Sequence, residues 1–220
     1  MPGLLIACDF DGTVTERDTL HVIVETFGTQ GLWRTLQPRL TAGEITVEQA
    51  MQEEFAEVRA PWSEVLPAVL GSAPVRRGFP DFVTWSREAG HRLVIVSNGF
   101  RRVIDAVLAR AGVGDLEIVS HDAVFSTEGC RLVWSERGER CELCGRRCKR
   151  HDLRRRWIEG QRLVYLGDGI SDRCAAQMAD LVFARAGLAE YLAERRVPFV
   201  SFEDFVGVRR ELERPAIAAA

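Results

Sequence analysis

Short apolar runs alternate along the chain with segments in which apolar residues recur at helical spacing. Two of these runs, residues 4–8 and 163–166, carry no charged side chain, which is typical of strands buried on both faces of a parallel sheet. Further strands are predicted at residues 92–96, 116–119, 124–126, 131–134, 181–184 and 199–200. Helices are predicted at residues 78–89, 100–111, 152–159, 171–179, 188–194 and 204–212. The alternation predicts an α/β fold with a Rossmann-like, doubly wound parallel sheet.

The segment after the first strand has a different pattern, because helical periodicity continues there without a strand. Thr46 and Gln49 have the spacing of a capping box, which marks the start of a helix, and Pro61 marks its end. We therefore expect residues 16–75 to form a small helical cap inserted after the first strand. The catalytic core is expected to comprise residues 1–15 and 76–220.

Composition limits the classes of partner. The 220 residues are 46% hydrophobic and 28% charged, with a formal net charge of −3. These values are ordinary for a soluble globular protein and provide no basic field that would attract nucleic acid or a membrane. The apolar run at residues 4–8 is too short for a signal peptide, and no stretch approaches the ~20 apolar residues needed to span a bilayer. We expect a cytoplasmic protein, whose oligomeric state the pattern leaves open.

Four aspartates follow two of the apolar strands, residues 4–8 and 163–166. Asp9 and Asp11 come after the first strand, and Asp168 and Asp172 come after the other. The carboxyl ends of parallel strands meet at the edge where open α/β sheets bind ligands, so these carboxylates are expected to converge. Their mutual repulsion predicts a hard divalent cation, and Mg²⁺ suits a set of oxygen ligands. One carboxylate of such a site can attack a phosphorus atom as a nucleophile.

The basic residues are almost all arginine. Lys149 is the only lysine among the 29 lysine and arginine residues, and it lies shortly before the second aspartate strand. Its compact ammonium group can neutralise a carboxylate and a phosphate as a point charge. The alternative is that this lysine simply lies on the surface.

Four motifs occur in order beside predicted strands: Asp9–Thr13 (DFDGT), Ser97, Lys149, and residues 167–172 (GDGISD). Together they resemble the haloacid dehalogenase superfamily, in its phosphoserine-phosphatase-like branch, over nearly the whole chain. The resemblance implies a hydrolase with a helical cap that acts on a phosphate ester. Ser171 departs from the asparagine that many relatives carry before the last aspartate.

The expected catalytic residues are Asp9, Asp11 and Lys149. Asp9 would attack phosphorus and form an aspartyl-phosphate, while Asp11 would protonate the leaving oxygen and later activate water. Mg²⁺ is expected on Asp9, Asp11, Asp168 and Asp172, and the resemblance implies that Asp11 contributes its backbone carbonyl.

Phosphate binding is expected at the end of the second strand. Ser97 would donate to a phosphate oxygen, helped by the backbone N–H groups of Asn98 and Gly99. The alternative for Ser97 is a role as N-cap of the following helix, and both roles can hold at once.

A cysteine-rich turn precedes Lys149. Cys141, Cys144 and Cys148 have the spacing of a zinc knuckle, and Cys130 or His151 could supply a fourth ligand. The alternative is a reduced cysteine cluster. Cys8 and Cys174 are interpreted as packing residues.

Two subgroups share this arrangement of cysteines followed by lysine: the methionine-salvage enol-phosphate phosphatases and the phosphoethanolamine and phosphocholine phosphatases. Residues 167–205 look closest to the first subgroup. Asp18 and Arg59 resemble the cap positions that hold amino and carboxylate groups in phosphoserine phosphatases, although ordinary capping and surface charge would also explain them.

The favoured function is a Mg²⁺-dependent phosphomonoesterase that hydrolyses a small-molecule phosphate through an aspartyl-phosphate. Two alternatives stay open: a phosphotransferase on the same scaffold, and a non-catalytic zinc-knuckle binding module. Acceptor-dependent product formation would indicate the transferase, and turnover of a simple aryl phosphate would exclude the binding module.

Overall fold

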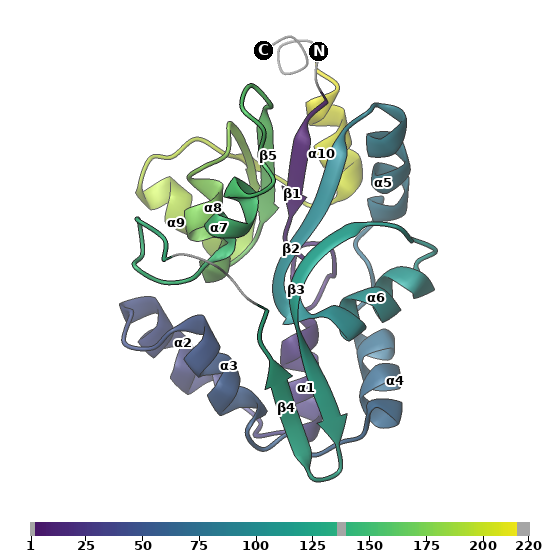
Figure 1. Ribbon diagram of the computed structural model, residues 1–220, viewed down its shortest axis with the longest axis vertical. Coiled ribbons are helices and arrows are strands. Elements are labelled where there is room, and N and C mark those ends of the chain that lie inside the picture. Colours follow the sequence, from purple (N-terminus) through teal and green to yellow (C-terminus); the bar gives the residue numbers. More distant parts are fainter. Residues whose placement is uncertain (1–2, 136–139, 215–220) are drawn as a thin grey trace.

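The computed structural model describes residues 3–135 and 140–214, so parts of the expected core at residues 1–2, 136–139 and 215–220 lie outside it. The described residues form a seven-stranded sheet in the order β4-β3-β2-β1-β5-β6-β7 (Figure 1). The strands are β1 (Leu5–Cys8), β2 (Arg92–Phe100), β3 (Glu117–Ser126), β4 (Gly129–Val133), β5 (Leu163–Gly167), β6 (Leu181–Ala184) and β7 (Val200–Ser201). All neighbours pair in parallel except β3 and β4. The predicted α/β class and the mostly parallel sheet are confirmed.

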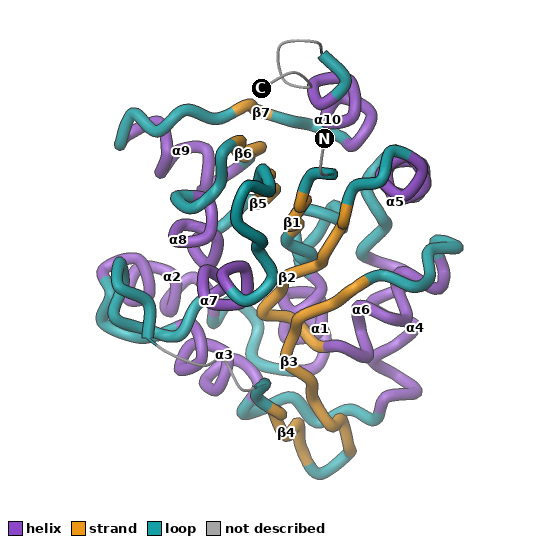
Figure 2. The backbone as a smooth tube through the Cα atoms, turned by 45° about the horizontal axis from the view of Figure 1, so that its top comes forward, coloured by secondary structure: helices purple, strands orange, loops and turns teal. Residues whose placement is uncertain are grey.

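Helices cover both faces of the sheet, as the two apolar faces of its buried central strands require (Figure 2). One face packs against α5 (Phe79–Glu88), α6 (Arg101–Arg110) and α10 (Phe205–Leu212). The other packs against α7 (Lys149–Arg154), α8 (Arg173–Ala176) and α9 (Ala186–Glu194). None of the described helices is long and apolar enough to cross a bilayer.

Four helices follow β1 and lie beyond the carboxyl ends of the strands (Figure 1). They are α1 (Thr19–Phe27), α2 (Trp33–Ala42), α3 (Val47–Phe55) and α4 (Trp62–Ser72). The predicted capping box is confirmed, because Thr46 and Gln49 exchange hydrogen bonds at the start of α3. The hairpin formed by β3 and β4 reaches in among these helices, which the sequence pattern did not indicate.

The chain enters and leaves this helical segment through neighbouring backbone positions. Thr15 and Val75 form an antiparallel bridge, and Arg76 donates its backbone N–H to the Val14 carbonyl at 2.7 Å. The buried Arg76 guanidinium also donates to the carbonyls of Gly12, Thr13 and Thr15 at 2.9 to 3.1 Å. Arg76 therefore holds the end of the helical segment against the turn after β1, where the segment begins.

Several elements differ from their predicted bounds, and three of these differences lie close to the expected site residues. β2 continues through residues 97–99 to Phe100, with a register shift against β3 that keeps this segment extended. β3 joins two predicted strands into one, because Phe100 pairs with His121 and Asp122 pairs with Val133 across the expected break. α7 begins at Lys149, three residues before its predicted start, because Cys148 adopts extended backbone and ends the preceding loop.

Candidate active site

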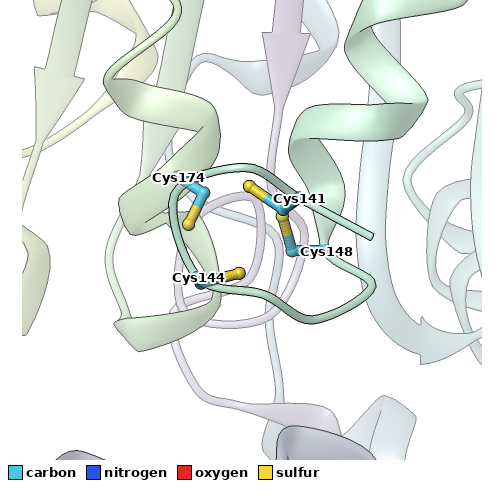
Figure 3. Close-up of side chains that lie close together, drawn as sticks. All are labelled: Cys141, Cys144, Cys148 and Cys174. Carbon is cyan, nitrogen blue, oxygen red and sulfur yellow. The ribbon is translucent and has the colours of Figure 1, made fainter. Parts of the chain in front are cut away.

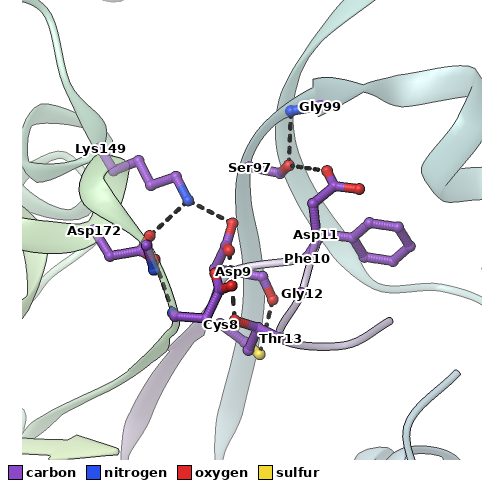
Figure 4. A network of polar contacts seen from close by, with 12 residues as sticks. Cys8, Asp9, Phe10, Asp11, Gly12, Thr13, Ser97, Gly99, Lys149 and Asp172 are labelled. Carbon is purple, nitrogen blue, oxygen red and sulfur yellow. Dashed lines mark hydrogen bonds and ion pairs between the residues drawn. The ribbon is translucent and has the colours of Figure 1, made fainter. Parts of the chain in front are cut away.

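The carboxyl ends of β1, β2 and β5 bring the expected catalytic residues together (Figure 4). Cys8 pairs in register with Ile95 on β2 and Leu166 on β5, so the segments that follow these three residues share one edge of the sheet. Asp9, Ser97 and Asp168 lie in these segments. Parallel pairing is thus the cause of their convergence.

Lys149 lies in the middle of the group. Its ammonium is 1% exposed and donates to Asp9 Oδ1 and, at 2.7 Å, to Asp172 Oδ1. Burial alone would favour the neutral amine, but the carboxylates of Asp172 and Asp9 outweigh burial and hold the pKa of Lys149 above its ordinary value. Lys149 is therefore a buried cation and not a surface residue.

Asp172 uses all of its acceptor capacity within the protein. Its Oδ1 accepts from Lys149 and, at 2.7 Å, from the Tyr165 hydroxyl. Its Oδ2 accepts from the backbone N–H groups of Asp168 and Gly169 at 3.0 and 2.9 Å. A carboxylate offers about four acceptor positions, so these four bonds fix the turn after β5 and hold Lys149. The sequence analysis missed Tyr165. Its role is seen only in the structure, where its buried hydroxyl bonds Asp172, seven residues later in the chain.

Asp11 is held by contacts that differ from those of Asp9. Its Oδ1 accepts from the backbone N–H and the hydroxyl of Thr19 at 2.9 and 2.5 Å, and Ser97 Oγ lies 3.4 Å from its Oδ2. Burial and the nearby charge of Asp18 raise the pKa of Asp11 to about 7, against the lowering effect of the Thr19 hydrogen bonds. A carboxyl with this pKa can both give and take a proton near neutral pH.

Glycines leave the room that these carboxylates occupy. A Cβ on Gly99 would lie 2.5 Å from Asp11 Oδ2, and a Cβ on Gly12 would overlap the Asp168 carboxylate. Gly12 also has a φ of +76°, which side chains other than glycine rarely adopt. The glycine of the first motif is therefore a steric requirement.

Three carboxylates form a compact oxygen-rich group. One carboxylate oxygen each from Asp9, Asp168 and Asp172 lies within 4.8 Å of the others. Burial first, and then the neighbouring carboxylates, raise the pKa of Asp9 to about 7 and that of Asp168 to about 9. Lys149 supplies one positive charge against three negative ones. The donor set therefore fits a hard divalent cation. Asp9 and Asp168 keep acceptor positions to bind it, whereas Asp172, also expected as a ligand, has its acceptor positions filled within the protein.

The expected phosphate-binding residues lie within β2 and not in a loop after it. The buried Ser97 Oγ accepts the Gly99 N–H at 2.8 Å, and Ser97, Asn98 and Gly99 all line the cavity described next. The N-cap of α6 is Phe100, which makes no side-chain capping bond, so the alternative interpretation of Ser97 as the N-cap is wrong.

A cavity of about 380 Å³ lies between the sheet edge and α1–α3. Its floor contains Asp9, Asp11 and Asp168. Its apolar wall is formed by Leu20, Trp33, Leu40, Val47, Ala50 and Met51. Asp18 and Glu54 add carboxylates to this wall, and burial together with the charge of Asp18 raises the pKa of Glu54 to about 7.

The two expected substrate residues lie apart. Asp18 lines the cavity and also caps α1 by accepting the His21 N–H at 2.9 Å. Arg59 does not line it: its side chain is 51% exposed and pairs with Glu57. The structure thus places Arg59 outside the cavity, because its side chain points to solvent between the buried residues Val58 and Ala60.

The fourth member of the cysteine group also requires a correction. Cys174, not Cys130 or His151, joins Cys141, Cys144 and Cys148, and all four sulfur atoms lie within 4.8 Å of one another (Figure 3). Cys130 lies on β4, half-buried against the main apolar core. Cys174 was interpreted as a packing residue at the start of a helix, and it lies 26 residues after Cys148 in sequence. Only the packing of α7 beside α8 brings the two together.

Comparisons with known proteins agree with this geometry. A family model described as haloacid dehalogenase-like hydrolase matches residues 6–177. A 2-hydroxy-3-keto-5-methylthiopentenyl-1-phosphate phosphatase of Geobacillus thermodenitrificans is 32% identical, with 98% of each chain covered. One of Brevibacillus brevis is 29% identical, with 97% of this chain and 98% of the relative covered. A solved phosphoserine phosphatase with a phospho-aspartyl intermediate analogue has a TM-score of 0.73 at 18% identity, covering 96% of this chain and 99% of the other.

Proposed function

Because the chain belongs to the haloacid dehalogenase-like hydrolase family and is a phosphatase, we propose that it hydrolyses 2-hydroxy-3-keto-5-methylthiopentenyl-1-phosphate, the substrate in the names of its similar relatives. The observation that carries the proposal is the cavity, which joins a carboxylate floor to an apolar wall. The floor suits a phosphate with its metal, and the wall suits a methylthioalkyl chain. Residues 16–75 act in this proposal as the cap that covers the substrate.

The reaction proceeds in two displacements. Asp9 attacks phosphorus, so that a bond from its carboxylate oxygen to phosphorus forms while the bond to the leaving enol oxygen breaks. Asp11 gives its proton to that oxygen. Water then attacks the aspartyl-phosphate, gives its proton to Asp11, and releases phosphate and the free Asp9 carboxylate. The pKa of about 7 at Asp11 supports both proton transfers.

Lys149 neutralises the nucleophile and the incoming phosphate, held in place by Asp172. Mg²⁺ would be held by the carboxylates of Asp9 and Asp168, together with the Asp11 carbonyl that the family resemblance implies. When bound, it would supply positive charge that offsets the negative charge of the phosphate group during the displacement. Ser97, Asn98 and Gly99 orient the phosphate from the opposite side.

The cap side of the cavity argues against phosphoserine as the substrate. Among the described residues, α1–α4 and the loops between them contribute no lysine or arginine to the cavity, while Asp18 and Glu54 contribute carboxylates. A substrate carboxylate would therefore meet Asp18 and Glu54 on this wall, since the arginine that lines the cavity, Arg173, lies on α8 of the core. We place the enzyme in the cytoplasm, with small-molecule phosphates as its partners.

A phosphate-ester panel assayed with Mg²⁺ tests the proposal. We expect the enol-phosphate to give the highest kcat/KM, ahead of phosphoserine, phosphoethanolamine and phosphocholine. Activity should disappear on exhaustive chelation and return with Mg²⁺, but return poorly with Ca²⁺, which is larger and less octahedral. A preference for phosphocholine or phosphoserine would overturn the substrate assignment. Product that forms only with an added alcohol acceptor would identify a phosphotransferase.

A further inference from the structure

The four cysteines beside the active site form a second group of metal-binding character, separate from the carboxylates. Cys141, Cys144 and Cys148 come from the loop before α7, and Cys174 comes from α8. Figure 3 shows their side chains gathered around one small space. From this geometry we propose that Cys141, Cys144, Cys148 and Cys174 bind one structural Zn²⁺ that joins the loop before Lys149 to α8.

The spacing of the sulfur atoms suits this ion. Tetrahedral zinc with four thiolates at about 2.3 Å requires sulfur atoms about 3.8 Å apart. All four lie within 4.8 Å of one another, so each needs to move by at most about 1 Å. All four are thiols in the structure, and thiol contacts join Cys148 to both Cys141 and Cys174.

The backbone of the loop is arranged around the sulfur atoms. The backbone of Leu143 and that of Cys144 hydrogen-bond the Cys141 sulfur, and Arg150 does the same for Cys148. The loop closes on itself, because the Cys141 carbonyl accepts the Gly145 N–H at 2.8 Å and Gly145 has a φ of +67°. Backbone donors aimed at sulfur stabilise thiolates and fix the direction of metal ligands.

Positive charge surrounds the cluster. Arg146, Arg147, Arg173 and Arg195 line a cavity of about 440 Å³ together with Cys144, Cys148 and Cys174. Zinc with four thiolates carries a net charge of −2, which these guanidinium groups would offset. The electrostatics of the loop therefore suit a thiolate–zinc centre.

Two of the four cysteines lie close to active-site residues in the sequence. Cys148 directly precedes Lys149, and Cys174 lies two residues after Asp172. If both cysteines bind one ion, that ion would hold Lys149 and Asp172, which form a buried ion pair, at a fixed separation. In the same loop Arg146 donates to the carbonyls of Gly43 and Ile45, at 2.5 and 3.1 Å, in the turn between α2 and α3. The loop thus contacts the active site on one side and the helical segment on the other.

Metal analysis of variants tests the site without reference to activity. Parent protein purified without chelator should contain about one zinc ion per chain. Cys174→Ser should lose most of it, whereas Cys130→Ser, the cysteine outside the cluster, should keep it. Equal zinc in both variants, or a parent that contains no zinc or contains iron, would overturn the proposal. A disulfide within the cluster, seen as a mass lower by two hydrogens, would overturn it too.

Cobalt substitution covers the case in which Cys174→Ser does not fold. Parent protein loaded with Co²⁺ should show the intense thiolate-to-cobalt absorption and the visible bands of a tetrahedral site, and Zn²⁺ should displace them. Hydrogen exchange should increase in residues 140–155 when zinc is removed, while β1 and β5 stay protected. Absence of the thiolate band, or exchange unchanged by zinc removal, would contradict the assignment.

Discussion

The carboxylate cluster (Asp9, Asp11, Asp168 and Asp172) and the cysteine cluster (Cys141, Cys144, Cys148 and Cys174) lie on either side of Lys149, but different forces hold them. The carboxylates extend from turns between buried parallel strands, so the apolar core fixes their positions. The cysteines lie on a loop, where Cys144 is exposed, and on a four-residue helix. The apolar core can thus hold like charges close together, whereas the loop that carries the cysteines would be held by the proposed zinc ion.

Asp9→Asn is the change with the largest expected effect, because an amide cannot attack phosphorus. Turnover should fall at least about 1,000-fold. The variant should fold, since the substitution is isosteric and removes one of three repelling charges. Steady-state kinetics and thermal unfolding measure the two effects separately. Near-normal turnover in a folded variant would reject the covalent mechanism.

Lys149→Arg keeps the charge and should still lower kcat about 100-fold. The ammonium is buried between two carboxylates, and a planar guanidinium is too bulky for the same two contacts. Arg150→Lys, on the next residue of α7, is the matched control and should retain activity. If Lys149→Arg has the activity of the parent protein, the proposed role of Lys149 is wrong.

Glu54→Gln should change stability in a pH-dependent way. The pKa of Glu54 is about 7 in the folded protein, above its ordinary value of 4.5, so the folded state binds this proton more tightly than the unfolded state. Below about pH 4.5 the Glu54 carboxyl therefore does not lower the free energy of unfolding. As pH rises through 7 it lowers the free energy of unfolding progressively, by at most about 3 kcal/mol. The variant should exceed the parent in melting temperature at pH 8, and the difference should shrink at pH 5. Exposed Glu53→Gln is the control, and an equal gain at both pH values would contradict the assignment.

Arg146→Gln has the smallest expected effect and tests whether the cysteine loop supports the helical segment. Loss of the bonds to Gly43 and Ile45 should raise KM about threefold and leave kcat nearly unchanged. Exposed Arg147→Gln is the matched control. Identical KM values in the two variants would show that the loop does not influence substrate binding.

The sequence predicted those parts of the site that depend on local order along the chain. Asp9, Ser97 and Asp168 each follow an apolar strand, and parallel pairing alone places the ends of such strands together. The ordered motifs also indicated Lys149, whose burial between two carboxylates the structure adds. The roles assigned to these residues stay predictions until the variants are measured.

Residues that depend on packing between distant elements could not be predicted. Cys174 joins the other cysteines only because α8 packs beside α7, and no spacing rule covers that distance. Tyr165 looks like one apolar residue of a strand until its hydroxyl is seen to reach Asp172. Arg59 was misplaced because its resemblance to a cap position carried no information about which way its side chain points.

The bridge between Thr15 and Val75 has a consequence for how this enzyme can diversify. Because the helical segment begins and ends at adjacent backbone positions, its length and sequence can change without altering the register of any strand. The loop-closure entropy of such an insertion grows only slowly with its length. Substrate preference can therefore evolve in a module that is exchanged as a unit, while Arg76 keeps the junction itself unchanged.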